Sequence, residues 1–170
     1  MQDPLFARPL DLKTKKHGNV LGVWLLPIAA PLKQITLQEE KWSNELPPKR
    51  QKEYRVSRAY ARLVMSNIFG VNTLEIPLFA PPGKAPQLEE GWGFISLSHC
   101  KDALLIGWSP YEIGVDIENS KRKINALTLG ERILSVNEKN VIKNIDKRNF
   151  NQAILAKWVE KEAAIKWQRG

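Results

Sequence analysis

Two carboxylates alternate with apolar residues in the sequence Gly-Val-Asp-Ile-Glu at positions 114–118. A strand places every second side chain on the same face, so we expect a strand here with Asp116 and Glu118 together on one face. A third acid, Glu162, lies in a predicted helix over residues 151–168. It falls within the apolar stripe that helical spacing gives to Ile154, Leu155, Trp158 and Ile165.

Three inward-facing acids constrain the fold, because they repel one another unless a cation lies between them. A divalent metal ion bound through carboxylate oxygens removes the repulsion, and Mg²⁺ carrying a phosphate substrate is the favoured case. Simpler interpretations stay open. Asp116 and Glu118 also suit a solvated strand face, and Glu162 could pair with Lys166 one helical turn later. Beside a metal-bound phosphate, Lys166 would instead neutralise a leaving group.

Composition limits the class of protein and its partners. The 170 residues suffice for one domain or two small halves, and the net charge is +8 with an isoelectric point near 9.6. This charge favours an acidic partner: nucleic acid, a phosphorylated cofactor or an acidic protein. No apolar run is long enough to cross a bilayer, so we expect no membrane partner. Cys100 is the only cysteine, which excludes an intrachain disulfide and favours a reducing, cytoplasmic location.

The remaining pattern indicates an arrangement of helices and strands that follows a loose polar arm at residues 1–18. Strands are expected over residues 19–26, 93–98 and 103–109, the last two forming an antiparallel meander with residues 114–118. Helices are expected over residues 36–44, from Pro48 to Phe69 with Gly70 as the stop, and over residues 129–144 and 151–168.

The helix that begins at Pro48 carries a basic face. Arg55, Arg58 and Arg62 share this face, opposite the apolar one. A solvated outer face is the ordinary explanation for such a pattern. The excess of basic over acidic side chains across residues 49–62 favours a role in binding anions.

Two further patterns suit phosphate binding. Ser98 and His99 end a predicted strand just before a turn, and Lys84 follows Gly83 in a proline-rich loop. This loop lacks the spacing of a P-loop. One cysteine and two histidines cannot form a structural zinc site, and no nucleophile elbow accompanies His99.

Four motifs follow one another along the chain: Gly-Lys-Ala-Pro at 83–86, Ser-His at 98–99, Gly-Val-Asp-Ile-Glu at 114–118, and Trp-Val-Glu-Lys-Glu-Ala-Ala-Ile-Lys at 158–166. In this order they resemble the Sfp-type 4′-phosphopantetheinyl transferases, with one residue inserted in the Gly-Lys-Pro loop. The family transfers the phosphopantetheine arm of coenzyme A to a serine of an acyl or peptidyl carrier protein and releases 3′,5′-ADP.

The resemblance implies a role for each matching residue. Asp116, Glu118 and Glu162 would hold Mg²⁺ on the pyrophosphate of coenzyme A, and Glu162 would also help to remove the proton of the attacking serine. Lys166 would stabilise the leaving phosphate. The adenosine 3′-phosphate and nearby groups would be bound by Lys84, Ser98 and His99, with Lys161 as a further phosphate-binding candidate.

The resemblance also implies an α+β fold of two similar halves, with antiparallel sheets, packed helices and the active site between the halves. The halves would span residues 19–110 and 111–170 of a monomer. In the family, the second half normally continues past the helix at 158–166, so its closing strands are expected to be missing from this chain.

Two other functions fit the basic charge. A metal-dependent nuclease would use the same acids, and such sites often show a D…[DE]-x-K pattern. Here Glu118 is followed by Asn119, and Glu160-Lys-Glu162 lacks a lysine two places after the acid. A nucleic-acid-binding module would use the basic face of the Pro48 helix but leaves Glu162 unexplained. The transferase is the favoured interpretation, with no nucleic acid as partner.

Overall fold

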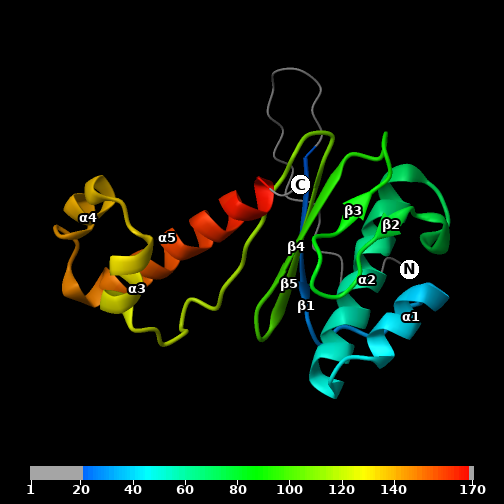
Figure 1. Ribbon diagram of the computed structural model, residues 1–170, viewed down its shortest axis with the longest axis horizontal. Coiled ribbons are helices and arrows are strands. Elements are labelled where there is room, and N and C mark those ends of the chain that lie inside the picture. The colour runs from blue at the N-terminus through cyan, green and yellow to red at the C-terminus, as the bar shows by residue number, and fades with distance from the viewer. Residues whose placement is uncertain (1–20, 169–170) are drawn as a thin grey trace, which may run out of the picture.

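The computed structural model describes residues 21–168, and the expected arm at residues 1–18 lies outside them. The fold is α+β, with antiparallel sheets and packed helices (Figure 1). A three-stranded sheet has the order β1-β5-β4, formed by Gly22–Pro27, Ala103–Ser109 and Phe94–His99. A two-stranded sheet joins β2 (Leu78–Phe79) to β3 (Gln87–Leu88). The helices are α1 (Leu37–Asn44), α2 (Pro48–Phe69), the short 3₁₀ helix η1 (Thr73–Glu75), α3 (Ala126–Ile133), α4 (Val136–Ile142) and α5 (Lys147–Trp167).

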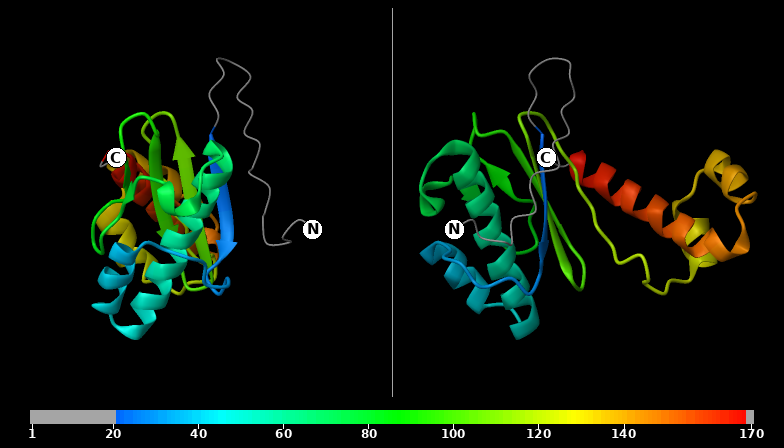
Figure 2. Two further views of the ribbon diagram at one scale, coloured as in Figure 1. Left: turned by 90° about the vertical axis from the view of Figure 1, so that its right-hand side faces the viewer. Right: turned by 180° about the vertical axis from the view of Figure 1, so that it is seen from behind.

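Helix α2 covers one face of the three-stranded sheet, and α5 lies on the other side (Figures 1 and 2). The predicted bounds of α2 are confirmed: proline stands at its first turn, and Gly70 closes it with a left-handed φ of 68°. Its apolar face packs against alternate residues of the strands. The core formed in this way includes Val56, Tyr60 and Val64 of the helix and Trp24, Leu104 and Ile106 of the sheet.

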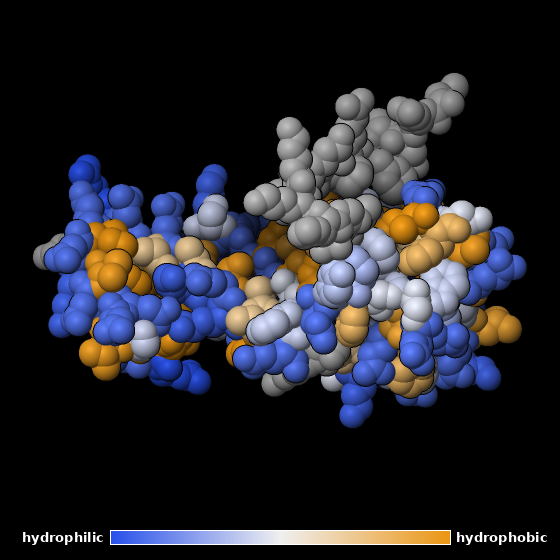
Figure 3. All heavy atoms as spheres, turned by 90° about the horizontal axis from the view of Figure 1, so that it is seen from above, coloured by the Kyte–Doolittle hydropathy of each residue, from blue (hydrophilic) through white to orange (hydrophobic). Residues whose placement is uncertain are grey.

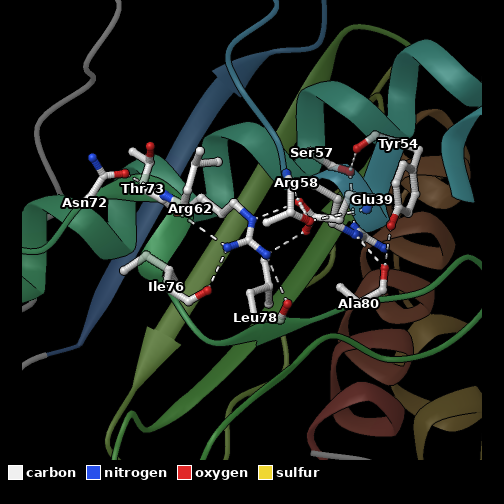
Figure 4. A network of polar contacts seen from close by, with 12 residues as sticks. Glu39, Tyr54, Ser57, Arg58, Arg62, Asn72, Thr73, Ile76, Leu78 and Ala80 are labelled. Atoms are coloured by element: carbon white, nitrogen blue, oxygen red, sulfur yellow. Dashed lines mark hydrogen bonds and ion pairs between the residues drawn. The ribbon is translucent and has the colours of Figure 1, made fainter. Parts of the chain in front are cut away.

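The prediction that α2 exposes a basic face is wrong for two of the three arginines. Arg58 is 9% exposed and Arg62 is 3% exposed. Arg62 donates hydrogen bonds to both carboxylate oxygens of Glu39, at 2.9 and 3.1 Å, and to the carbonyls of Ile76 and Leu78 (Figure 4). The reason is a second layer, because α1 and the chain from η1 to β2 pack over this side of the helix. Arg55 alone keeps a partly exposed position, paired with Glu40.

The predicted strand at residues 114–118 is not part of a ladder, so the expected meander is wrong. The third strand of the sheet is β1, which pairs with β5. Residues 114–118 instead run extended over the α5 side of the sheet. Their N–H groups bond to serine hydroxyls of β4: Val115 donates to Ser96 Oγ at 3.1 Å and Ile117 to Ser98 Oγ at 3.3 Å.

Helices α3, α4 and α5 form a lobe on this side of the sheet (Figures 1 and 2). The single helix expected over residues 129–144 is two helices, because Ser135 begins a new one with a capping box to Glu138. In α5, Ile154 and Leu155 are buried as expected, whereas Ile165 is 38% exposed, so the apolar stripe ends before it. Glu162 therefore lies beyond the packed part of the stripe and is half-buried.

The surface of the lobe is mainly hydrophilic on the side drawn in Figure 3, with separate apolar patches between the charged side chains. Exposed apolar side chains of the lobe include Leu127, Val136 and Val141. Among residues 21–168 there is no helix whose length and apolar character would suit it to span a membrane.

Candidate functional site

The first part of the site is a pocket of about 210 Å³ between α2, the end of β4 and the proline-rich loop. Lys84 and His99, two of the predicted phosphate-binding residues, both line it. Lys84 is carried by a turn in which Gly83 has a φ of 77° and the Lys84 N–H bonds to the carbonyl of Pro81. The structure adds Arg50 and Arg58 of α2 to the same wall.

Arg58 is the residue of this pocket that sequence reasoning misplaced. Its Nε donates to the carbonyl of Ala80 at 2.9 Å, its Nη1 donates to Ser57 Oγ at 3.2 Å, and its guanidinium lies 4.5 Å from the ring of Tyr54 (Figure 4). Burial lowers the pKa of Arg58 from its usual value, which still leaves a guanidinium charged at neutral pH. The pocket therefore has a fixed cation at its back and the flexible Lys84 at its rim.

His99 stands where the first pocket meets a second one. Its Nε2 lies 3.6 Å from a carboxylate oxygen of Glu53. Burial lowers the pKa of His99, and the nearby Arg50, Lys166 and Arg58 act in the same direction, whereas Glu53 opposes them. We therefore expect a neutral imidazole at pH 7, which donates one hydrogen bond from the nitrogen that carries the proton and accepts one at the other nitrogen.

The second pocket, of about 490 Å³, continues from His99 towards the predicted acids. It shares Arg50, Glu53 and His99 with the first pocket and adds Glu118. Its basic side chains are Lys49, Arg50, Lys101 and Arg122. These basic side chains give the pocket a positive electrostatic potential beside a carboxylate. Such a pocket suits an anionic ligand that carries more than one phosphate group.

The acids on the α5 side have cationic partners. Asp116 Oδ1 accepts hydrogen bonds from Lys166 Nζ and from Ser98 Oγ, each at 2.6 Å. Glu118 is bonded to the guanidinium of Arg122 and to the N–H of Asn119. Glu162 lies one helical turn before Lys166 on α5, so it is carried on the same side of that helix.

A close approach of two backbones brings Asp116 to Lys166. A Cβ added to Gly114 would lie 1.9 Å from the carbonyl oxygen of Ala163 and 2.5 Å from the N of Trp167. Only glycine allows the extended segment to touch α5 at this point. The glycine of the Gly-Val-Asp-Ile-Glu motif therefore has a physical role, which is to set the distance between Asp116 and the helix that carries Glu162 and Lys166.

The donor atoms of the three acids are of the kind that Mg²⁺ prefers, namely carboxylate oxygens. In the part of the chain that the structure describes, no three Asp, Glu, His or Cys side chains are gathered in the geometry of a metal site. Protein cations instead balance two of the acids, Lys166 at Asp116 and Arg122 at Glu118. Two of the three acids are therefore neutralised by cationic side chains of the protein itself.

Two predicted site residues lie apart from the groups that they were expected to join. Ser98 faces Asp116 and is not part of the pocket that Lys84 and His99 line. The strand period explains this, because neighbouring residues of β4 point to opposite faces of the sheet. Lys161 Nζ bonds to a carboxylate oxygen of Glu138 in α4 at 3.0 Å.

Comparison of this chain with protein-family models and with curated proteins gave no match.

Proposed function

We propose that this protein is a 4′-phosphopantetheinyl transferase of the Sfp type, which moves the phosphopantetheine arm of coenzyme A to a serine of an acyl or peptidyl carrier protein. The observation that carries the proposal is a pair of adjoining pockets, lined by Lys84, His99 and Glu118. The extended segment that carries Glu118 also carries Asp116, which pairs with Lys166 of α5 outside these pockets. The four motifs of the resemblance are the source of these same residues.

The charges of the two pockets suit coenzyme A, which carries a 3′-phosphate and a pyrophosphate. Lys84, Arg58 and His99 bind the 3′-phosphate at the first pocket, and Arg50 and Arg122 bind the pyrophosphate at the second. Asp116, Glu118 and Glu162 would hold Mg²⁺, which would supply charge neutralisation for the pyrophosphate.

The residues of α5 act on the reacting groups. Glu162 accepts the proton of the attacking serine hydroxyl, which forms the new O–P bond to the phosphopantetheine phosphate. The bond between the two phosphates breaks, and Lys166 neutralises the charge that develops on the 3′,5′-ADP leaving group. Positioning and charge neutralisation are the main requirements of such a displacement.

The finer points of the proposal concern organisation. The chain is organised as two halves, residues 19–110 and 111–170, with the site between them, and within the described residues all the strands belong to the first half. The enzyme acts as a monomer in the cytoplasm, on coenzyme A and an acidic carrier protein. The support is the placement of the two pockets and the acids where the α2 side of the sheet meets the segment that leads to α5.

The test is intact-mass spectrometry of an apo acyl carrier protein incubated with this chain, coenzyme A and Mg²⁺. We expect the carrier to gain the mass of one phosphopantetheine arm and EDTA to prevent the gain. Lys84→Ala should raise KM for coenzyme A with little change in kcat, whereas Lys33→Ala, remote from both pockets, should change neither. Absence of transfer to several acyl and peptidyl carriers, together with metal-dependent cleavage of nucleic acid, would replace the proposal by the nuclease.

A further inference from the structure

Glu53 of α2 is a carboxylate among the cations of the two pockets. It lines both of them, and among the described residues around the first pocket it is the only acid. Its side chain is 19% exposed, and its Oε2 lies 3.6 Å from His99 Nε2 and 3.7 Å from Arg50 Nη1. A carboxylate repels a bound phosphate, so the position of Glu53 calls for a physical reason.

His99 provides this reason better than Arg50 does. The side chain of Arg50 is 65% exposed, and an exposed ion pair contributes little to stability. The contact with His99 instead joins α2 to the end of β4, at the point where the two pockets meet. Because Nε2 faces Glu53, and no protein group within residues 21–168 bonds to Nδ1, the second nitrogen is left to meet a ligand.

The other charged groups around His99 are mainly cations. Burial, followed by Arg50, Lys166 and Arg58, lowers the pKa of the imidazole, whereas Glu53 raises it. The pocket walls add Lys84 on one side, and Lys49, Lys101, Arg122 and the acid Glu118 on the other. A phosphate bound among these cations brings negative charge next to the imidazole, which favours its protonated form.

We infer that Glu53 is a positioning residue, which orients the His99 imidazole and stabilises its protonated form when a phosphate group enters the first pocket. This inference rests on the proposed function, because the phosphate is the 3′-phosphate of coenzyme A. The imidazolium has two N–H donors, so Nε2–H faces Glu53 while Nδ1–H donates to a phosphate oxygen. The proton comes from solvent, and no covalent bond forms or breaks.

The experiment follows the ring protons of His99 by NMR as a function of pH, with and without 3′,5′-ADP as the probe. The chain has two histidines, His17 and His99, so the signal missing in His99→Asn assigns the spectrum. In the wild type, 3′,5′-ADP should raise the pKa of His99. Glu53→Gln should lower this pKa, with and without the probe, by about one pH unit.

Glu40→Gln is the matched control. Glu40 is also a carboxylate paired with an arginine of α2, but it lies outside both pockets. This variant should leave the pKa of His99 unchanged, free and bound.

The pH dependence of KM for coenzyme A in the transfer assay provides the second readout. In the wild type, KM should rise as the pH rises through the pKa of His99 in the complex, because an N–H donor to the phosphate is lost. In Glu53→Gln this rise should begin about one pH unit lower, with little change in kcat. His99→Asn gives the baseline for titration of the phosphate itself, whose second pKa is about 6.

The outcomes separate the inference from the proposed function. Binding of 3′,5′-ADP with an equal pKa of His99 in the wild type and Glu53→Gln overturns the positioning role and leaves the proposed function intact. Binding to the wild type without a rise in this pKa does the same. Absence of 3′,5′-ADP binding to the wild type overturns the proposed function and the inference with it. A lower pKa in Glu53→Gln but not in Glu40→Gln supports both.

Discussion

The two sides of the three-stranded sheet use charged residues in opposite ways. On the α2 side, Arg62 and Glu39 form an ion pair that is 3% and 1% exposed, surrounded by backbone carbonyls and apolar side chains. On the α5 side, Lys166 and Asp116 form a pair whose side chains are 31% and 12% exposed. Strand β4 contacts this pair through the hydroxyl group of Ser98, which donates to Asp116.

The difference in burial decides which of the two ion pairs can exchange a partner for a ligand. Arg62 has five hydrogen-bond acceptors in fixed positions, so no ligand could displace Glu39 without leaving buried groups unsatisfied. Asp116 and Lys166 stay accessible to solvent, so a phosphate or a metal ion can compete for them. The α2 side therefore holds a fixed ion pair that stabilises the fold, and the α5 side holds an ion pair that a ligand can separate.

The largest expected effect is on stability at the α2 side. Arg62→Leu leaves the Glu39 carboxylate buried without its counter-ion, so unfolding in urea should show a loss of about 3–5 kcal/mol. Arg55→Leu on the same helix removes a partly exposed pair with Glu40 and should cost only about 0.2–1 kcal/mol. Equal losses in the two variants would contradict the assignment of Arg62 to a buried network.

Next in size is the effect of removing an acid on the α5 side. Asp116→Ala or Glu162→Ala should lower the rate of carrier modification by about 10²–10³-fold, because charge stabilisation in the transition state is lost. The circular dichroism spectrum should stay unchanged. Glu131→Ala is the control, since Glu131 is an exposed acid of the same lobe that pairs with Lys139. A wild-type rate in either acid variant would remove the metal-site assignment.

A smaller effect is expected where the two backbones touch. Gly114→Ala places a methyl group against the main chain of α5, and such overpacking typically costs about 1–3 kcal/mol. Gly107→Ala meets only the side chains of Val115 and Ile113, which can shift, so its cost should be lower. Chemical denaturation measures the free energy of unfolding of both variants. A larger loss in Gly107→Ala than in Gly114→Ala would show that the main chain of α5 moves away more easily than the side chains of Val115 and Ile113.

The smallest effect concerns pH in the lobe. The Ser135 backbone N–H, followed by Lys161 and the Ser135 hydroxyl, lowers the pKa of Glu138 from 4.5 to about 2. A carboxyl whose folded-state pKa is lowered stabilises the fold above its unfolded pKa, and this stabilisation is lost as the pH falls. Hydrogen exchange should therefore show weaker protection of α4 amides as pH falls from about 4.5 towards about 2. In Glu138→Gln this pH dependence should be absent.

The sequence predicted best where a local signal decided the structure. The bounds of α2 followed from a proline at its start and a glycine after its end, and the N-terminal cap of α1 followed from Thr36 and Glu39. The alternation of polar and apolar residues at 114–118 gave a wrong prediction of a paired strand, because extended backbone has the same period of two whether or not it forms a ladder. The N–H groups of this segment bond to serine hydroxyls of β4, and no local sequence pattern predicts a bond from a backbone N–H to a serine far away in the sequence.

The site was predictable to the same extent. Lys84 and His99 line the same pocket. Asp116, Glu118 and Glu162, which were expected to surround a metal ion, are not gathered in the geometry of a metal site within the described residues, and the pair of Asp116 with Lys166 was not foreseen. The role of Arg58 in the pocket was missed, because helical spacing gives its direction but not the layer of α1 and β2 that packs over it. Ser98 could have been placed correctly, since the period of two already separates it from His99.

The opposite directions of Ser98 and His99 make β4 sensitive to the exact number of residues that precede them. Insertion of a single residue early in the strand would exchange the faces of all the side chains that follow, and Asp116 would meet the apolar side chain of Leu97 in place of the Ser98 hydroxyl. Insertion of two residues would restore the faces and shift them only along the strand. In a library of variants with insertions in β4, insertions of two residues should give folded protein more often than insertions of one residue, although a single residue is the smaller change.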